Sequence, residues 1–179
     1  ATGAVNEGGQ ITYTATLTNA AGTPVTVTLS NGAIITIAAG ATTGSVTVDA
    51  PKDDVYKDAG TVEATIQDAT GGNFENLVAS DTPAVTTVND TIDTSTVSLS
   101  ATANVAEGET VVYTATIGAP VTGSPVVVTL SNGQIITIPV GETTGSVNFV
   151  APNSPLAGGS SLSVKIDDAK GGNYEKLDV

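Results

Sequence analysis

The stretch Val27-Thr-Leu-Ser-Asn-Gly32, followed by Ile34-Ile-Thr-Ile37, decides the fold of this chain of 179 residues. It combines two apolar runs with a period of two and a Ser-Asn-Gly turn between them, the pattern of a β-hairpin. The same stretch returns at 128–133, again followed by Ile-Ile-Thr-Ile at 135–138. The chain therefore contains two copies of one structural unit.

Other segments of the first half recur in the second half in the same order. They are VNEG at 5–8 and VAEG at 105–108, YTAT at 13–16 and 113–116, TTGSV at 42–46 and 143–147, Ala-Pro at 50–51 and 151–152, and DATGGNFENL at 68–77 and DAKGGNYEKL at 168–177. The offset is 100 residues in some pairs (5 to 105) and 101 in others (42 to 143). We predict a first repeat at 1–90, a linker at 91–94 and a second repeat at 95–179.

The strand pattern within each repeat predicts the fold class. Apolar residues alternate with threonine, as in Ile11, Tyr13 and Ala15, which is typical of half-buried antiparallel strands. Turn signals recur about every 8–12 residues, the spacing of a β-sandwich. We expect strands at 96–102, 110–117, 125–130, 134–139, 145–151 and 160–167, and a last one that corresponds to 84–89 of the first repeat. The sequence thus predicts an all-β protein with two tandem immunoglobulin-like β-sandwich domains, about seven antiparallel strands per complete unit.

The two repeats begin and stop at different points of the unit. The opening strand at 96–102 has no counterpart in the first repeat, and the closing strand at 84–89 has none in the second. We expect the chain to be a piece of a longer array, with the first strand of repeat 1 and the last strand of repeat 2 truncated. Each truncation is expected to leave an unpaired sheet edge.

The composition excludes several classes of function. Cysteine, histidine, methionine and tryptophan are absent, which excludes disulfides, zinc and haem sites, and catalysis by Cys or His. With aromatics at 3% and a net charge of −13, the chain is a poor partner for nucleic acid and anionic membranes but attracts cations. No apolar run reaches the roughly 18 residues of a membrane span. We expect no enzyme, no small-molecule substrate and no membrane insertion.

Strand parity predicts where the acidic residues gather. Each strand reverses direction, so the loop after the first strand lies at the far end of a domain, and the loop before the last strand lies at the near end. The linker joins the far end of repeat 1 to the near end of repeat 2. The residues expected to converge on this junction are Glu7, Asp90, Asp93, Asp168, Asn173 and Glu175. Clustered carboxylates repel unless a cation lies between them, and oxygen-only ligands favour Ca²⁺, with carbonyls of the Gly-Gly turn available to complete the shell.

Structural alternatives remain open for these residues. Asp and Asn before Gly-Gly are common in tight turns for backbone reasons alone. Asp53, Asp54 and Asp58 have no acidic counterparts in the second repeat and are interpreted as solvated surface. The row of threonines at 12–18 is another candidate ligand face, although threonine on an exposed strand face is ordinary β-sheet chemistry.

Taken in order, VAEGETVVYTATI, VTLSNGQIITIPVGETTGSV and DDAKGGNYE resemble the tandem repeats of giant bacterial RTX biofilm adhesins, the large adhesion proteins exported by type I secretion. The resemblance implies immunoglobulin-like extender domains with calcium at their junctions, located outside the cell on the bacterial surface. The positions matched to metal ligands are Glu7, Glu107, Asp68, Asp168, Asn73, Asn173, Glu75, Glu175, Asp90 and Asp93.

Two functions from different classes fit these observations. The first is a structural spacer that calcium stiffens, whose partners are the neighbouring repeats of the same chain. The second is an adhesin module that binds a sugar or a protein through its loops. A binding module needs loops that differ between repeats and carry aromatics, whereas these loops are short and repeated, which favours the spacer.

Overall fold

The computed structural model describes residues 1–156, 158–159 and 161–179, and the chain divides into two compact units. Unit 1 comprises Ala1–Asp53 and Asp58–Thr91, and unit 2 comprises Asp54–Lys57 and Ile92–Val179. The regular elements of the described residues are all β-strands, and every sheet lies within one unit. The predicted all-β fold of immunoglobulin-like sandwiches is confirmed.

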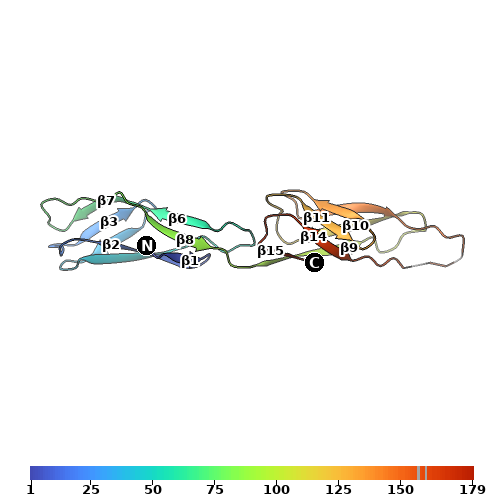
Figure 1. Ribbon diagram of the computed structural model, residues 1–179, viewed down its shortest axis with the longest axis horizontal. Coiled ribbons are helices and arrows are strands. Elements are labelled where there is room, and N and C mark those ends of the chain that lie inside the picture. The colour runs from blue at the N-terminus through green and yellow to red at the C-terminus, as the bar shows by residue number, and fades with distance from the viewer. Residues whose placement is uncertain (157, 160) are drawn as a thin grey trace. The chain divides into compact units, whose positions relative to one another are not determined.

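Unit 1 contains the first eight strands. They are β1 (Ala4–Asn6), β2 (Gln10–Thr16), β3 (Val25–Leu29), β4 (Ile34–Ile37), β5 (Thr43–Asp49), β6 (Gly60–Ala64), β7 (Ile66–Gly71) and β8 (Ala84–Asn89). The sheet orders are β4-β3-β7, β2-β5 and β1-β8-β6. Figure 1 shows β3 and β7 in one layer of the unit and β2 in the opposite layer.

The core of unit 1 follows from the alternation of apolar and polar residues along its strands. Along β3 the residues Val25, Val27 and Leu29 are buried, while the threonines between them are exposed or half-buried. They pack against Ile11 of β2 and Ile35 of β4 in one hydrophobic cluster. Each fully buried aliphatic side chain stabilises the fold by about 1.5–3 kcal/mol relative to exposure. Burial of these alternating apolar side chains therefore holds the two layers together without any disulfide.

Unit 2 repeats this design. Its strands are β9 (Thr94–Ala101), β10 (Thr110–Ile117), β11 (Val126–Leu130), β12 (Ile135–Ile138), β13 (Thr144–Val150), β14 (Ile166–Lys170) and β15 (Lys176–Asp178). They form the sheets β13-β10-β9-β15 and β12-β11-β14. Five strands agree with the predicted ranges to within two residues, and β8 of unit 1 agrees without any difference.

The sixth predicted strand needs a correction in both units. In unit 1 it divides at Thr65 into β6, which pairs with β8, and β7, which pairs with β3. Ser30 holds the division point: its Oγ accepts a hydrogen bond from the Thr65 N–H (3.1 Å), and its N–H donates to the Thr65 carbonyl (2.9 Å). One chain segment thus passes from one sheet to the other.

In unit 2 the strand predicted at 160–167 lies at 166–170 instead. Ser160 falls outside the described residues, and 161–165 are not in a strand. The equivalent residues of unit 1 form β6 because β8 pairs with them, and no described strand of unit 2 takes the place of β8. A strand requires a partner for its backbone N–H and C=O groups.

Each unit buries one tyrosine hydroxyl at the same repeat position. Tyr13 and Tyr113 are each 2% exposed, and neither hydroxyl has a hydrogen-bond partner among the described residues. Burying a polar group without a partner costs about 1–3 kcal/mol. Each core is therefore stabilised by packing of the aromatic ring and not by the hydroxyl.

The Tyr113→Phe variant is expected to keep or slightly raise the melting temperature of unit 2. The change removes an unpartnered buried hydroxyl and leaves the ring packing against Phe149 intact, at a centroid distance of 6.2 Å. Differential scanning calorimetry of the full chain measures the shift. A loss of several degrees would mean that the hydroxyl has a partner that stabilises the fold.

Candidate metal centre

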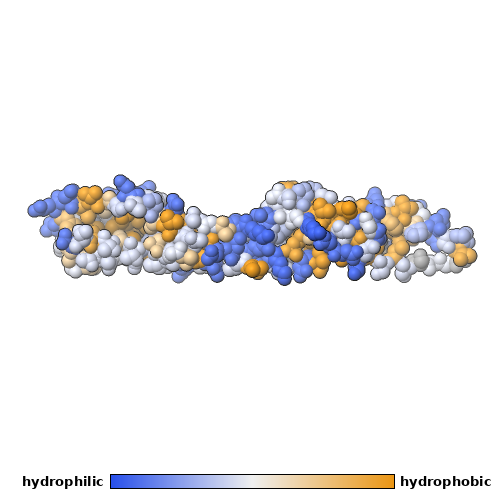
Figure 2. Space-filling view, in the orientation of Figure 1, coloured by the Kyte–Doolittle hydropathy of each residue, from blue (hydrophilic) through white to orange (hydrophobic). Residues whose placement is uncertain are grey.

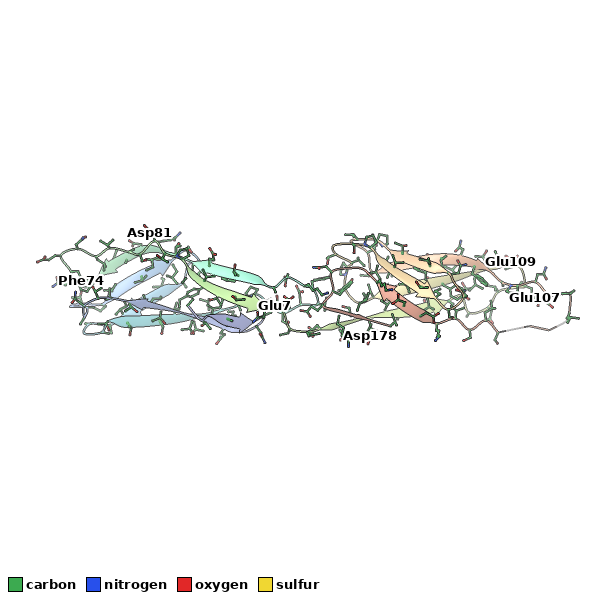
Figure 3. The ribbon with its side chains drawn as sticks, viewed as in Figure 1. Glu7, Phe74, Asp81, Glu107, Glu109 and Asp178 are labelled. Atoms are coloured by element: carbon green, nitrogen blue, oxygen red, sulfur yellow. The ribbon has the colours of Figure 1, made fainter. Side chains whose placement is uncertain are left out.

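The first pair of acidic residues lies at one end of unit 1. Strands β1 and β8 run parallel, with Asn6 opposite Asn89, so the residues that follow them, Glu7 and Asp90, emerge side by side. The Glu7 N–H donates to the Asn89 carbonyl at 3.0 Å. A carboxylate oxygen of Glu7 lies within 4.8 Å of one of Asp90. Figure 3 shows Glu7 at the end of the unit opposite to Phe74, as strand parity predicts.

The electrostatics of this pair favour a cation. Glu7 is only 7% exposed and Asp90 is half-buried. Asp90 Oδ1 accepts a hydrogen bond from the Asp58 N–H at 3.3 Å, which holds this carboxylate in place. Two ionised carboxylates this close repel each other, and more strongly where burial reduces screening by water. A divalent cation between them turns the repulsion into attraction.

The second pair lies in unit 2 and is built in the same way. Strands β15 and β9 run parallel, with Lys176 opposite Thr94, so Glu175 and Asp93, which precede them, lie side by side. The Asp93 N–H donates to Glu175 Oε2 at 2.6 Å. The other oxygen, Oε1, is buried and has no hydrogen-bond partner among the described residues. Buried polar atoms are nearly always partnered, so this oxygen is suited to a ligand.

The covalent chain limits how far apart the two pairs can be. Asp90 and Asp93 are separated only by Thr91 and Ile92. Three residue steps of fully extended chain span at most about 11 Å between Cα atoms. The linker therefore keeps the Cα atoms of these two aspartates, one from each pair, within this distance.

The aspartates of the DAxGGN segments belong to strands and not to a loop, contrary to the prediction. Asp68 lies in β7 opposite Thr28, and Asp168 lies in β14 opposite Thr129. Asp168 forms an ion pair with Lys170 at 2.8 Å. This hydrogen bond, and then the charge of Asp168, raises the pKa of the Lys170 ammonium. Asp168 thus has a cation from its own strand.

The remaining predicted positions have structural contacts or lie in solvent. Asn73 adopts a left-handed backbone conformation with φ of 54°. Asn173 donates from Nδ2 to the Lys57 carbonyl at 3.0 Å, within unit 2. Glu75 and Glu107 are exposed, and Glu107 Oε2 accepts a hydrogen bond from the Ser154 N–H at 3.2 Å. In none of these contacts do two carboxylates meet.

Sequence reasoning missed the role of the segment Asp54–Lys57, which is part of unit 2. Tyr56 stacks on Tyr174 with a centroid distance of 5.5 Å, and its hydroxyl donates to the Pro120 carbonyl at 2.6 Å. Tyr174 donates to the Ala119 carbonyl at 2.7 Å. Burial, and then the neighbouring Tyr56, raises the pKa of Tyr174. Tyr56 has no aromatic counterpart in the second repeat, so the repeat pattern carried no signal for it.

A family profile for the LapA domain matches the chain twice, over residues 1–91 and 93–179. The two matches together leave out only Ile92. None of the curated proteins matches the chain. Within the described ranges, no helix is long and apolar enough to cross a membrane.

Proposed function

Because the chain belongs to the LapA domain family, named for a large biofilm adhesin, we propose that its two units are structural spacer repeats of such an adhesin. Membership supports a non-enzymatic role in adhesion at the cell surface. The finer proposal is an extender of the RTX type, outside a bacterial cell, which holds a distal binding region away from the surface. Two tandem copies of one domain, joined by a short linker, suit this mechanical role.

The proposal assigns one calcium ion to the linker. Glu7 and Asp90 of unit 1, with Asp93 and Glu175 of unit 2, supply its side-chain oxygens. The single observation that carries this assignment is the close pair of carboxylates formed by Glu7 and Asp90. The unpartnered Oε1 of Glu175 adds to it. Calcium takes six to eight oxygen ligands and tolerates irregular geometry, which suits carboxylates together with nearby carbonyls.

The mechanism is a change in stiffness at the linker. Units joined by a short segment move relative to each other unless something fixes the joint. The Glu7 N–H donates to the Asn89 carbonyl, and the Glu175 carboxylate accepts a hydrogen bond from the Asp93 N–H, so each glutamate is anchored at one end of the linker. An ion that binds all four acidic residues crosslinks the two anchored glutamates and restricts the hinge. Calcium outside the cell then sets how far a series of such repeats extends.

Calcium is expected to raise the melting temperature of the chain. An ion that binds only the folded state stabilises it by about 2.7 kcal/mol when its concentration is one hundred times the dissociation constant. Calorimetry in millimolar calcium, in chelator and in magnesium at equal ionic strength measures the effect. Magnesium matched to calcium in ionic strength controls for screening of the net charge of −13. Identical melting curves in calcium and in chelator would refute the proposed site.

Calcium is also expected to narrow the distribution of distances between the two units. Small-angle X-ray scattering of the full chain, with and without calcium, measures this distribution directly. Because each unit has its own hydrophobic core, circular dichroism is expected to stay the same in both conditions. A distribution equally broad in calcium would contradict the stiffening mechanism, even if the ion binds.

A further inference from the structure

The connection between β5 and β6 leaves unit 1 and returns to it. Its middle part, Asp54–Lys57, belongs to unit 2, whereas Asp53 before it and Asp58 after it belong to unit 1. The chain therefore passes between the units three times, twice through this connection and once from Thr91 to Ile92. A second connection, besides the linker, thus joins the two units.

Unit 2 holds the middle part of this connection by hydrogen bonds of the β-sheet type. The segment forms an antiparallel β-bridge with Tyr174. The Glu175 N–H donates to the Val55 carbonyl, and the Lys57 N–H donates to the Asn173 carbonyl, both at 3.0 Å. The Asn173 side chain also donates from Nδ2 to the Lys57 carbonyl at 3.0 Å. These bonds fix the segment on unit 2 in the way that a short strand is added to a sheet edge.

Side-chain packing adds to these backbone bonds. Tyr56 stacks on Tyr174 with 5.5 Å between ring centroids, and its hydroxyl donates to the Pro120 carbonyl at 2.6 Å. Val55 and Tyr56 are half-buried and pack against the hydrophobic core of unit 2, to which Tyr174 belongs. Figure 2 shows mainly hydrophilic residues on the viewed face at the end of unit 2 that the linker enters. The apolar side chains of the segment are therefore docked into the unit and not displayed on its surface.

Unit 1 fixes both ends of the connection beside the start of the linker. The Thr91 hydroxyl donates to Asp53 Oδ1, where the connection leaves the unit. The Asp58 N–H donates to Asp90 Oδ1 at 3.3 Å, where the connection returns. Both ends are thus bonded to the last two residues of unit 1, from which the linker continues.

We propose that Val55–Lys57 form a clasp, a second fastening of the two units that limits motion at the hinge without any bound ion. Units joined by one short linker move relative to each other. A connection that is fixed at both ends on unit 1, and docked between them on unit 2, restricts this motion for as long as the docking lasts. The accepting surface consists of Pro120 and residues 173–175. Calcium at the linker then acts on a hinge whose range is already limited.

Tyr56 is the side chain on which the docking depends most. It supplies both the stacked ring and the hydroxyl that donates to Pro120. Tyr56→Ala removes these two contacts and leaves only hydrogen bonds that exposed groups also make with water. The change lies in a connection and in no strand, so both units keep their strands and are expected to fold.

Amide hydrogen exchange, measured by NMR in chelator, tests the docking in solution. In the parent chain the amides of Lys57 and Glu175 are expected to be protected, because each donates to a carbonyl across the docking contact. Tyr56→Ala is expected to speed up their exchange at least about tenfold. The amides of Ala21 and Val121 donate to carbonyls within unit 1 and unit 2, so they report on folding and are expected to exchange as in the parent.

A distance measurement between the units tests the effect on the hinge. The chain has no cysteine, so Asp81→Cys and Glu142→Cys place one spin label at an exposed position of each unit. Double electron–electron resonance in chelator is expected to give a broader distance distribution for Tyr56→Ala than for the parent. Lys52→Ala is the matched control, at an exposed position of the same connection outside the docked segment, and is expected to keep the parent distribution.

The outcomes separate the clasp from the calcium site. Unprotected amides in the parent, or protection that Tyr56→Ala leaves unchanged, would overturn the docking. Equal distance distributions for the parent and Tyr56→Ala would overturn its role at the hinge. An equal effect of Lys52→Ala would also contradict the proposal, because the connection would then act without the docked ring. Every measurement is made without calcium, so failure of the proposed calcium site leaves these results unchanged.

Discussion

The Gly171→Ala variant is expected to lower the free energy of unfolding of unit 2 by about 3 kcal/mol. Gly171 has φ of +104°, and a Cβ there would lie 2.1 Å from the carbonyl oxygen of Pro125. Neither backbone can move away, because Lys170 is paired with Val127 in the ladder of β14 and β11. For a domain of this size the loss corresponds to a decrease of roughly 12–24 °C in melting temperature.

Gly133→Ala is the matched control in the same unit. Gly133 also has a positive φ, of +81°, but a Cβ there meets no atom within 4 Å. Only the left-handed backbone then opposes alanine, at about 1–2 kcal/mol. Calorimetry is expected to show a clearly larger shift for Gly171→Ala, confined to the transition of unit 2. Equal shifts of the two variants would mean that the close approach to Pro125 relaxes without cost.

The same contact explains why the GGN segment recurs. In unit 1 a Cβ on Gly71 would lie 2.3 Å from the Pro24 carbonyl oxygen, and the next glycine packs under Phe74. The sequence offered the carbonyls of this Gly-Gly turn as further calcium ligands, but the backbone geometry alone is sufficient to explain why both glycines recur. Asp168, which belongs to the same segment, is held in a strand beside Lys170. A repeated motif therefore does not separate a ligand from a turn.

The fold was predictable because it depends on local pattern. Alternation in β3 and β11, with the Ser-Asn-Gly turn after each, defines a hairpin wherever it occurs. The sixth strand was not predictable, because its boundaries depend on a partner distant in sequence. Gly60–Ala64 is a strand beside β8, while the equivalent part of unit 2, with no such described partner, is not.

The acidic pairs were partly predictable, for a geometric reason. Strand direction alone brings Glu7 to the end of unit 1 where Asp90 leaves β8. The number of strands that precede a loop gives this end correctly, even when the predicted strand bounds are shifted. The strand count predicts only at which end of a domain a residue lies, however, and not the distances between the side chains at that end. It therefore grouped Asp168 and Asn173 with Glu175, although those two side chains pair with Lys170 and the Lys57 carbonyl.

The Asp90→Asn variant is expected to lose most of the stabilisation by calcium, from about 2.7 kcal/mol to below about 1 kcal/mol at the same calcium concentration. Asparagine keeps an oxygen that can accept the hydrogen bond from the Asp58 N–H, so unit 1 is expected to fold normally. It removes the negative charge beside the buried Glu7 and thus the main attraction for the ion. In chelator the variant is expected to be at least as stable as the parent, because the repulsion between the two carboxylates is gone.

Two further variants distinguish a calcium ion bound at the linker from general screening of the protein's negative charge. Asp81→Asn makes the same change in charge at an exposed position of unit 1, which Figure 3 shows away from Glu7. Asp168→Asn removes the acidic residue that already pairs with Lys170 in unit 2. Both are expected to keep the full calcium response in calorimetry and in scattering. If all three variants lose the response equally, calcium acts by screening the net charge of −13, and the four acidic residues at the linker hold no ion.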